Sequence, residues 1–232
     1  MHWGATTQNI TQTGDLLQLR KAHRIYLNQL SRIFTALAKL ADKSKDMALP
    51  GRTHGQHAVP ATYGLKVAIW IDEFARHTER LRQCEPRVFQ ALLGGAAGTV
   101  ASFGDEGLDV QARLAAHLDM PAMQVPARSI MDHLVEHVML LGLLAATCGK
   151  FGYEIYTGMK QEFGEVEEPI SPGTVGSSTM PQKRNPHLSQ DVMAYAAQIR
   201  TMVPLAMESV MTEHEANRCL LYTSPSPRDS NL

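Results

Sequence analysis

The chain has 232 residues, of which 44% are hydrophobic and 19% charged, a balance typical of a folded globular protein rather than a disordered one. Its formal net charge of −1 provides no bulk field toward nucleic acid or anionic lipid, so we expect neither as a partner. The three cysteines, Cys84, Cys148 and Cys219, form no CxxC pair, which argues against a zinc site or a disulfide framework and favours the cytoplasm. The sequence has no run of about 18 apolar residues, so no membrane span is predicted.

Long helical segments separated by polar loops dominate the chain. The first polar stretch, residues 2–9, is followed by a helix whose apolar residues recur at alternating spacings of four and three. These residues are Tyr26, Leu30, Ile33, Leu37 and Leu40. Such a seam indicates a helix that packs nearly parallel to its neighbours.

A second polar loop, residues 51–57, reads GRTHGQH and precedes a helix predicted over about residues 61–84. Pro60 and Pro86 bracket this helix, as expected of a start and a stop. A glycine-rich loop follows at residues 94–99, where the absence of large side chains permits close backbone approach. Its spacing is not GxGxxG and no strand precedes it, so a dinucleotide-binding fold is not expected.

The second half repeats this organisation. Apolar residues spaced by three and four predict a long helix from Ile130 to Ile155. A third polar loop, residues 176–186, reads GSSTMPQKRNP and leads into a last helix that runs toward Glu213. Strand signals are scarce, because no stretch alternates cleanly over six residues. We therefore predict an all-α fold, an elongated up-and-down helix bundle.

The polar loops carry a family resemblance. The third loop closely resembles the signature GSSxMPxKxNP of the fumarase/aspartase superfamily, whose members break C–N or C–O bonds by β-elimination and usually release fumarate. The second loop resembles the GRTHxQ segment of that superfamily. The first resembles its H-x-G-x-T-S-x-D segment, with Thr7 in the serine position and Asn9 in the aspartate position. Residues 94–98 and 163–169 are similar to the adenylosuccinate lyase and carboxymuconate cycloisomerase branch.

The resemblance, which covers nearly all of residues 2–218, implies roles for individual residues. Ser177 would be the general base that removes the β-proton, and His54 the general acid that protonates the leaving group. Lys183 and Asn185 would hold the carboxylate beside the carbanion, where a fixed cation stabilises the transition state most. Further substrate contacts are implied for Thr53, Thr6, Thr7, His2, Ser178, Met180 and Arg128. No metal or organic cofactor is implied, because the substrate carboxylate is itself the electron sink.

Several of these residues have structural alternatives. Ser177 could simply cap a turn, and His57 could replace His54 as the acid. His133 and His137 lie at i, i+4 on a predicted helix, a spacing that can ligate a metal. No third ligand is evident, and we interpret His137, which falls on the apolar seam, as a core residue.

The resemblance also implies a larger assembly. Residues 1–218 would be the central helical domain of a lyase subunit whose N-terminal and C-terminal domains are missing from this sequence. Residues 219–232 contain two prolines and no apolar period, resemble translated adapter sequence, and are interpreted as a non-native tail. Subunits of this family form homotetramers in which three protomers each supply one loop to a shared active site.

The implied reaction is anti β-elimination from a succinyl-type substrate, a small dicarboxylate-containing molecule, with release of fumarate. His54 in its GRTHGQ context favours an adenylosuccinate-lyase-like cleavage of a C–N bond. A 3-carboxy-cis,cis-muconate cycloisomerase-like enzyme is the alternative, favoured by the first loop and by residues 94–98. A second alternative is a non-catalytic helical scaffold, which predicts that Ser177→Ala and His54→Asn leave function unchanged.

Overall fold

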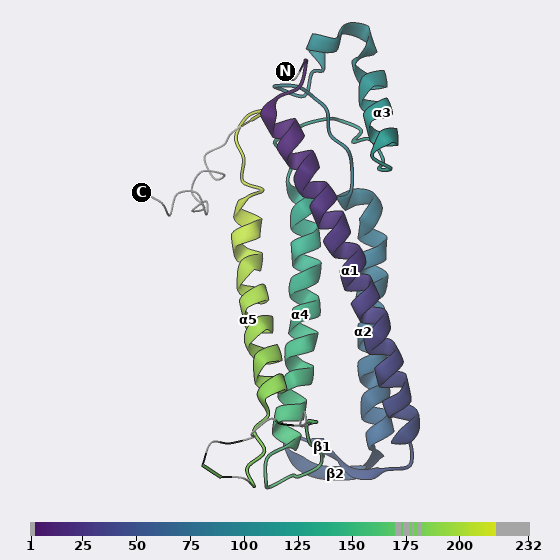
Figure 1. Ribbon diagram of the computed structural model, residues 1–232, viewed down its shortest axis with the longest axis vertical. Coiled ribbons are helices and arrows are strands. Elements are labelled where there is room, and N and C mark those ends of the chain that lie inside the picture. Colours follow the sequence, from purple (N-terminus) through teal and green to yellow (C-terminus); the bar gives the residue numbers. More distant parts are fainter. Residues whose placement is uncertain (1–2, 170–172, 174–176, 178, 181, 217–232) are drawn as a thin grey trace.

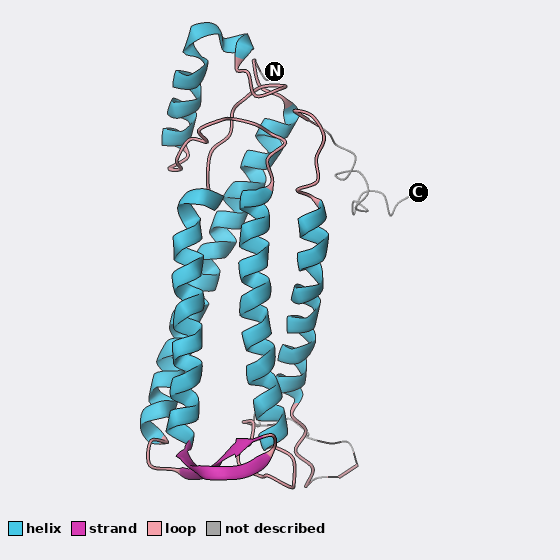
Figure 2. Cartoon of the chain, turned by 180° about the vertical axis from the view of Figure 1, so that it is seen from behind, coloured by secondary structure: helices cyan, strands magenta, loops and turns pink. Residues whose placement is uncertain are grey.

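The computed structural model describes residues 3–169, 173, 177, 179–180 and 182–216, and within them four long helices lie side by side (Figure 1). These helices are α1 (Thr7–Lys43), α2 (Tyr63–Val88), α4 (Asp132–Gly158) and α5 (His187–Glu208). A two-stranded hairpin closes one end of the bundle (Figure 2), and a small unit built around η1 (Ala101–Glu106) and α3 (Gly107–His117) lies at the other end. The predicted elongated helix bundle is confirmed, while residues 219–232 lie outside the described part.

The α1 helix is buried along a seven-residue repeat. Leu16, His23, Leu30 and Leu37 face the other helices of the bundle, as the a positions of a coiled coil do. The remaining members of the predicted seam are exposed, because they lie beside this line rather than on it. Their exposed fractions are 38% for Tyr26, 37% for Ile33 and 37% for Leu40.

The α2 helix presents a complete heptad seam to α1 and α4. Its buried residues alternate spacings of three and four and are Val67, Trp70, Phe74, His77, Leu81, Cys84 and Val88. The Trp70 ring meets Phe151 of α4 edge-on, with ring centroids 4.8 Å apart. The apolar part of the seam up to Leu81 belongs to one of the two hydrophobic clusters, whereas Cys84 and Val88 belong to the other.

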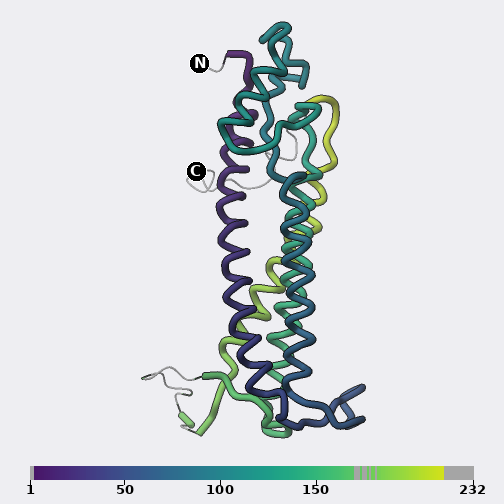
Figure 3. Tube along the Cα trace, turned by 90° about the vertical axis from the view of Figure 1, so that its right-hand side faces the viewer, coloured from purple at the N-terminus to yellow at the C-terminus, as the bar shows by residue number. Residues whose placement is uncertain are grey.

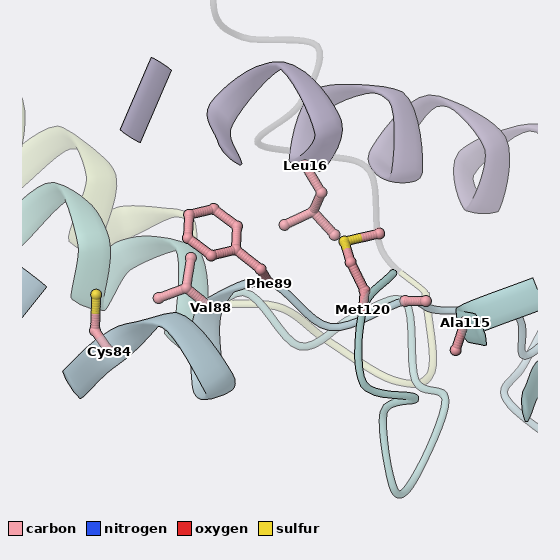
Figure 4. Packing of buried hydrophobic residues seen from close by; sticks show 7 residues of the cluster. Leu16, Cys84, Val88, Phe89, Ala115 and Met120 are labelled. Carbon is pink, nitrogen blue, oxygen red and sulfur yellow. The ribbon is translucent and has the colours of Figure 1, made fainter. Parts of the chain in front are cut away.

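The second cluster joins the bundle to the small unit at its end. Leu16 of α1 and Phe89, which follows α2, pack there with Ala115 of α3 and with Met120 (Figure 4). The connection is reinforced by backbone hydrogen bonds of Ala91, whose N–H donates to Pro121 and whose carbonyl accepts from Met123. The glycine-rich segment lies in this region, and a Cβ on Gly94 would come within 1.8 Å of the Pro126 carbonyl oxygen.

The α4 helix lies between α2 and α5 and packs on both sides (Figure 1). Its side toward α5 carries small residues at spacings of three and four, so α5 can approach closely: Gly142, Ala145, Gly149 and Gly152. Among the described helices, α4 is also the one with the length and apolar composition of a membrane span. Of its most apolar stretch, 28% is buried within the described part of the chain.

The hairpin and the helix ends correct the sequence prediction. Residues predicted to lack strands form β1 (Ala48–Thr53) and β2 (Gln56–Thr62), which pair antiparallel. The α2 helix begins at Tyr63, after Pro60, and continues through Pro86 to Val88. A proline in the last turn removes only one backbone hydrogen bond, so it does not end the helix there. The α1 helix begins at Thr7, inside the predicted first loop.

Candidate active site

The predicted site residues are divided between two opposite ends of the bundle. Thr6 and Thr7 are at the start of α1, whereas the hairpin follows its end (Figure 3). A 37-residue helix that rises about 1.5 Å per residue separates the two ends by roughly 55 Å. A single copy of the chain therefore does not bring the three polar loops together.

The end that carries the first loop is held by polar contacts. The backbone N–H of Thr6 donates to the Asn9 side-chain oxygen at 3.1 Å, and Asn9 is 1% exposed. This cap of α1 gives Asn9 a structural role where the family pattern has aspartate. His2 lies outside the described residues.

Arg128 lies at the same end and links two segments. Its Nε donates to the Ala96 carbonyl at 2.6 Å, and its Nη1 donates to the Gln8 side-chain oxygen at 3.0 Å. The Gln8 amide in turn donates to the Arg128 carbonyl at 3.1 Å. These bonds tie the glycine-rich loop to the first turn of α1, and a substrate contact by Arg128 stays a prediction.

The opposite end presents His54 at the tip of the hairpin. His54 and Gly55 form a two-residue turn with φ values of 50° and 75°, and Thr53 and Gln56 are the last paired residues. Positive φ at both turn positions is the geometry of type I′ hairpins, in which histidine is tolerated and glycine favoured. Both Thr53 and His54 are exposed, so the turn holds the imidazole outward from the chain.

His57, the alternative acid, lies behind this tip. Its Nε2 is 3.4 Å from Nη2 of Arg52. A ring nitrogen shared with a guanidinium acts as the acceptor in such a contact. The role of general acid stays a prediction for His54, with His57 as its alternative.

The third loop forms a turn around Ser177. The Ser177 hydroxyl oxygen accepts a hydrogen bond from the Met180 N–H at 3.3 Å, and the Lys183 N–H donates to the Met180 carbonyl at 3.0 Å. The first contact fits a turn-capping serine, and it is also the kind of donor that stabilises an alkoxide. Ser178 lies outside the described residues.

A cleft of about 970 Å³ opens beside this loop, between it and the end of α4. Its volume is within the range of small-molecule sites. Met180, Lys183 and Asn185 line it. Three further lining residues carry no motif that the sequence analysis could have used: Tyr156, Lys160 and Gln190. The cleft brings two of the predicted carboxylate-binding residues together with a second ammonium group, that of Lys160, and with the carboxylates of Glu165 and Glu167.

The helix bundle and its loops define a class of protein. Long helices that display polar loops at both ends are the arrangement expected of the fumarase/aspartase superfamily, and the family model described as "Lyase" matches residues 1–201. The chain belongs to this lyase family.

Individual relatives carry several activities. The chain is 44% identical over 215 residues to an N-acetyl-S-(2-succino)cysteine lyase of Enterococcus italicus, covering 93% of this chain and 47% of that protein. It is 40% identical to a 3-carboxy-cis,cis-muconate cycloisomerase of Pseudomonas aeruginosa, covering 93% and 47%. It is 39% identical to an adenylosuccinate lyase of Methanothermobacter thermautotrophicus, covering 93% and 48%. The chain thus spans about half the length of the curated relatives it matches.

Solved structures show the same likeness. The crystal structure of the 3-carboxy-cis,cis-muconate lactonizing enzyme from Pseudomonas putida matches with a TM-score of 0.89 and 38% identity, covering 95% of this chain and 49% of that one. A fumarate lyase from Mesorhizobium sp. BNC1 matches with a TM-score of 0.86 and 34% identity, covering 95% and 49%. The predicted family and fold are confirmed by these matches.

Proposed function

We propose that the chain forms the central part of a lyase that releases fumarate from a succinyl-type substrate by β-elimination. The observation that carries this proposal is the third loop, in which the Ser177 hydroxyl is held by a backbone N–H while Lys183 and Asn185 face one cleft. His54 is displayed at the same end of the bundle. Family membership supports the reaction class.

The proposed chemistry uses these groups in one order. Ser177, as an alkoxide, takes the β-proton, and the C–H electron pair moves onto the neighbouring carboxylate. Lys183 and Asn185 stabilise the added negative charge there. The electron pair then returns to form the C=C bond of fumarate as the bond to the leaving group breaks, and His54 supplies the proton that the leaving atom needs.

The leaving group is the finer part of the proposal. His54 favours an adenylosuccinate-lyase-like C–N cleavage, because an amine leaves poorly unless it is protonated. The identity to N-acetyl-S-(2-succino)cysteine lyases, 44% and 38% in two relatives, supports a sulfur leaving group as the second candidate. The 40% identity to a cycloisomerase keeps that activity as a third candidate.

We also propose that the active enzyme is a homotetramer with shared sites. The separation of Thr6 and Thr7 from His54 supports this, because a second, oppositely directed copy could place its first loop beside the hairpin of the first. Large apolar side chains on the outer face of α5 offer the surface for such contacts.

Activity of the complete gene product tests the proposal. With adenylosuccinate and N-acetyl-S-(2-succino)cysteine as substrates, we would follow the release of fumarate by its ultraviolet absorbance. For the cycloisomerase activity, we would follow the loss of 3-carboxymuconate. Ser177→Ala should lower kcat by about 10²-fold or more on the accepted substrate, the range for loss of a general base. Thr179→Ala, which removes a hydroxyl two residues away, is the matched control and should retain activity. Full activity in Ser177→Ala would refute the proposed base and favour the non-catalytic scaffold.

A further inference from the structure

A short segment, residues 163–168, lies between the two predicted catalytic loops at one end of the bundle. It follows the end of α4 and precedes the third loop, and the hairpin lies beside it (Figures 1 and 2). The segment contacts the hairpin and also the first turn of α5, which directly follows the third loop.

The first contact is an ion pair with the hairpin. Arg52, two residues before His54, donates from Nη2 to Glu165 Oε1 at 2.6 Å and from Nη1 to Oε2 at 3.1 Å. The two side chains are only 19% and 20% exposed, and the guanidinium carbon lies 4.9 Å from the centre of the Phe163 ring. A two-bonded Arg–carboxylate pair that also stacks on an aromatic ring fixes orientation as well as distance.

The electrostatics of this pair agree with its geometry. The hydrogen bond from Arg52 lowers the pKa of the Glu165 carboxyl, and burial opposes that shift only in part. The Glu165 carboxylate is therefore charged at neutral pH, and its ion pair with Arg52 on the hairpin is formed there.

The second contact is with the start of α5. The Glu168 carboxylate accepts from the backbone N–H of Leu188 at 3.0 Å and from that of Ser189 at 2.8 Å, and also from the Ser189 hydroxyl. These N–H groups belong to the first turn of α5 and have no partner within the helix, so an anion there is favoured twice, by hydrogen bonds and by the helix dipole. Lys183 and Asn185 lie just before this turn.

The segment itself is fixed to α4. The Glu165 N–H donates to the Gly158 carbonyl at 2.9 Å. The Val166 side chain packs directly over Gly158, where an added Cβ would come within 2.7 Å of Cγ2. The segment that contacts the hairpin and α5 is therefore itself anchored to the end of α4.

We propose that Glu165 and Glu168 are positioning residues for the β-elimination: Glu165 sets the place of His54 through Arg52, and Glu168 sets the place of Lys183 and Asn185 through α5. This inference rests on the proposed function. In this assignment Glu165 acts through Arg52, and Glu168 acts through the first turn of α5.

Two substrates separate these roles in the complete gene product. An alkylamine bound to succinate must be protonated by the general acid before it can leave. A nitrothiophenolate bound to succinate leaves as the anion and needs no proton. Glu165→Gln should lower kcat about tenfold or more for the amine and within about threefold for the thiolate, because only the first depends on His54. Glu168→Gln should lower kcat for both substrates and raise KM, because the carboxylate of both is bound by the third loop.

Tryptic cleavage after Lys183 and Arg184 supplies a readout that is independent of activity. Cleavage should be faster in Glu168→Gln by about tenfold and unchanged in Glu165→Gln, because only Glu168 holds the start of α5. Glu162→Gln removes an exposed carboxylate just before the segment and is the matched control for both measurements.

The outcomes distinguish the two levels of the proposal. Equal slowing of both substrates by Glu165→Gln, or wild-type kinetics and proteolysis in Glu168→Gln, would overturn the positioning roles. If the unaltered gene product releases fumarate from neither substrate, the proposed function fails, whereas the rate of tryptic cleavage still decides whether Glu168 anchors the third loop.

Discussion

Four buried histidines lie on α1, α2 and α4: His23, His77, His133 and His137. The His137 side chain is fully buried, and its ring lies 5.2 Å from the ring of His23 and 6.0 Å from that of Phe89. His23 is bonded through Nε2 to Glu85 at 3.0 Å, whereas both ring nitrogens of His137 and of His133 lack a hydrogen-bond partner among the described residues. The interpretation of His137 as a core residue is confirmed.

These histidines should make the fold sensitive to acid. Burial, together with the nearby His23, lowers the pKa of His137 to about 4, against a weaker opposing effect of Glu136, and burial also lowers the pKa of His133. A histidine whose folded pKa is depressed contributes stability that is complete above its unfolded pKa of about 6.5. That stability is lost as the pH falls from about 6.5 to 4, by about 3 kcal/mol for His137 alone.

Urea unfolding at a series of pH values checks this prediction. The free energy of unfolding should fall between about pH 6.5 and pH 4 in the unaltered chain, and the fall should be smaller in His137→Leu. His117→Gln, which replaces an exposed histidine of α3, is the control and should keep the full slope. An identical pH dependence in the unaltered chain and in His137→Leu would contradict the assignment.

The helices were the elements most open to prediction from sequence. The spacing of apolar residues located α1, α2, α4 and α5, because a helix buried on one side must repeat its apolar residues every three or four positions. The hairpin was missed for a physical reason: its strands are exposed or half-buried and contain Pro50 and Pro60, so they show neither clean alternation nor typical strand composition. The His54-Gly55 turn was its one local signal.

The junction of α1 with α2 depends on a glycine. Gly64 lies in the first turn of α2, and an added Cβ would come within 2.6 Å of Lys45 Cα and 2.8 Å of the Ala41 carbonyl oxygen. Its N–H donates to the Ser44 carbonyl at 2.9 Å. Because these neighbouring atoms belong to the backbone, they can make room for a Cβ only if the end of α1 moves. The hairpin follows directly after α1, so it would move as well.

Two alanine substitutions test this junction against a matched site. Gly64→Ala should lower the free energy of unfolding by about 1–3 kcal/mol, the usual cost of overpacking. Gly14→Ala, inside α1, meets no atom within 4 Å of its Cβ and should raise stability by about 0.5–1 kcal/mol through helix propensity. Denaturant unfolding of both variants provides the measurement, and equal effects of the two would show that the close approach at Gly64 is not what determines stability there.

At the scale of the whole molecule, the sequence predicts site residues but not where they lie. The motifs named His54, Ser177 and Lys183 from their order along the chain. The division of the loops between two ends follows from helix lengths and topology, which only the folded chain shows. The contacts of Glu165 and Glu168 were hidden for a similar reason, because their partners are 113 and about 20 residues away in sequence.

The outer face of α5 carries large apolar side chains that the described residues leave exposed. Only Ser189 and Ala196 are buried on this helix. Val192, Met193 and Val203 lie against glycines of α4, whereas most of its other large apolar residues are exposed. The most exposed of these, in and just after α5, are Leu188, Tyr195, Met202, Leu205 and Met211. A surface of this kind, continuous along a helix, is typical of an interface rather than of a free face.

A charge placed on this face should therefore prevent assembly without unfolding the chain. Leu205 is 65% exposed, so Leu205→Glu costs little within one copy but buries an unpaired carboxylate in any interface that α5 forms. Leu108→Glu, at a similarly exposed leucine on α3 (61%), is the matched control. Sedimentation velocity on the complete gene product should show a homotetramer for the unaltered protein and for Leu108→Glu, and smaller species with unchanged helical circular dichroism for Leu205→Glu. A tetramer that survives Leu205→Glu would place the interface elsewhere, and a monomeric unaltered protein would refute the proposal of shared active sites, since one copy keeps Thr6 and His54 at opposite ends of the bundle.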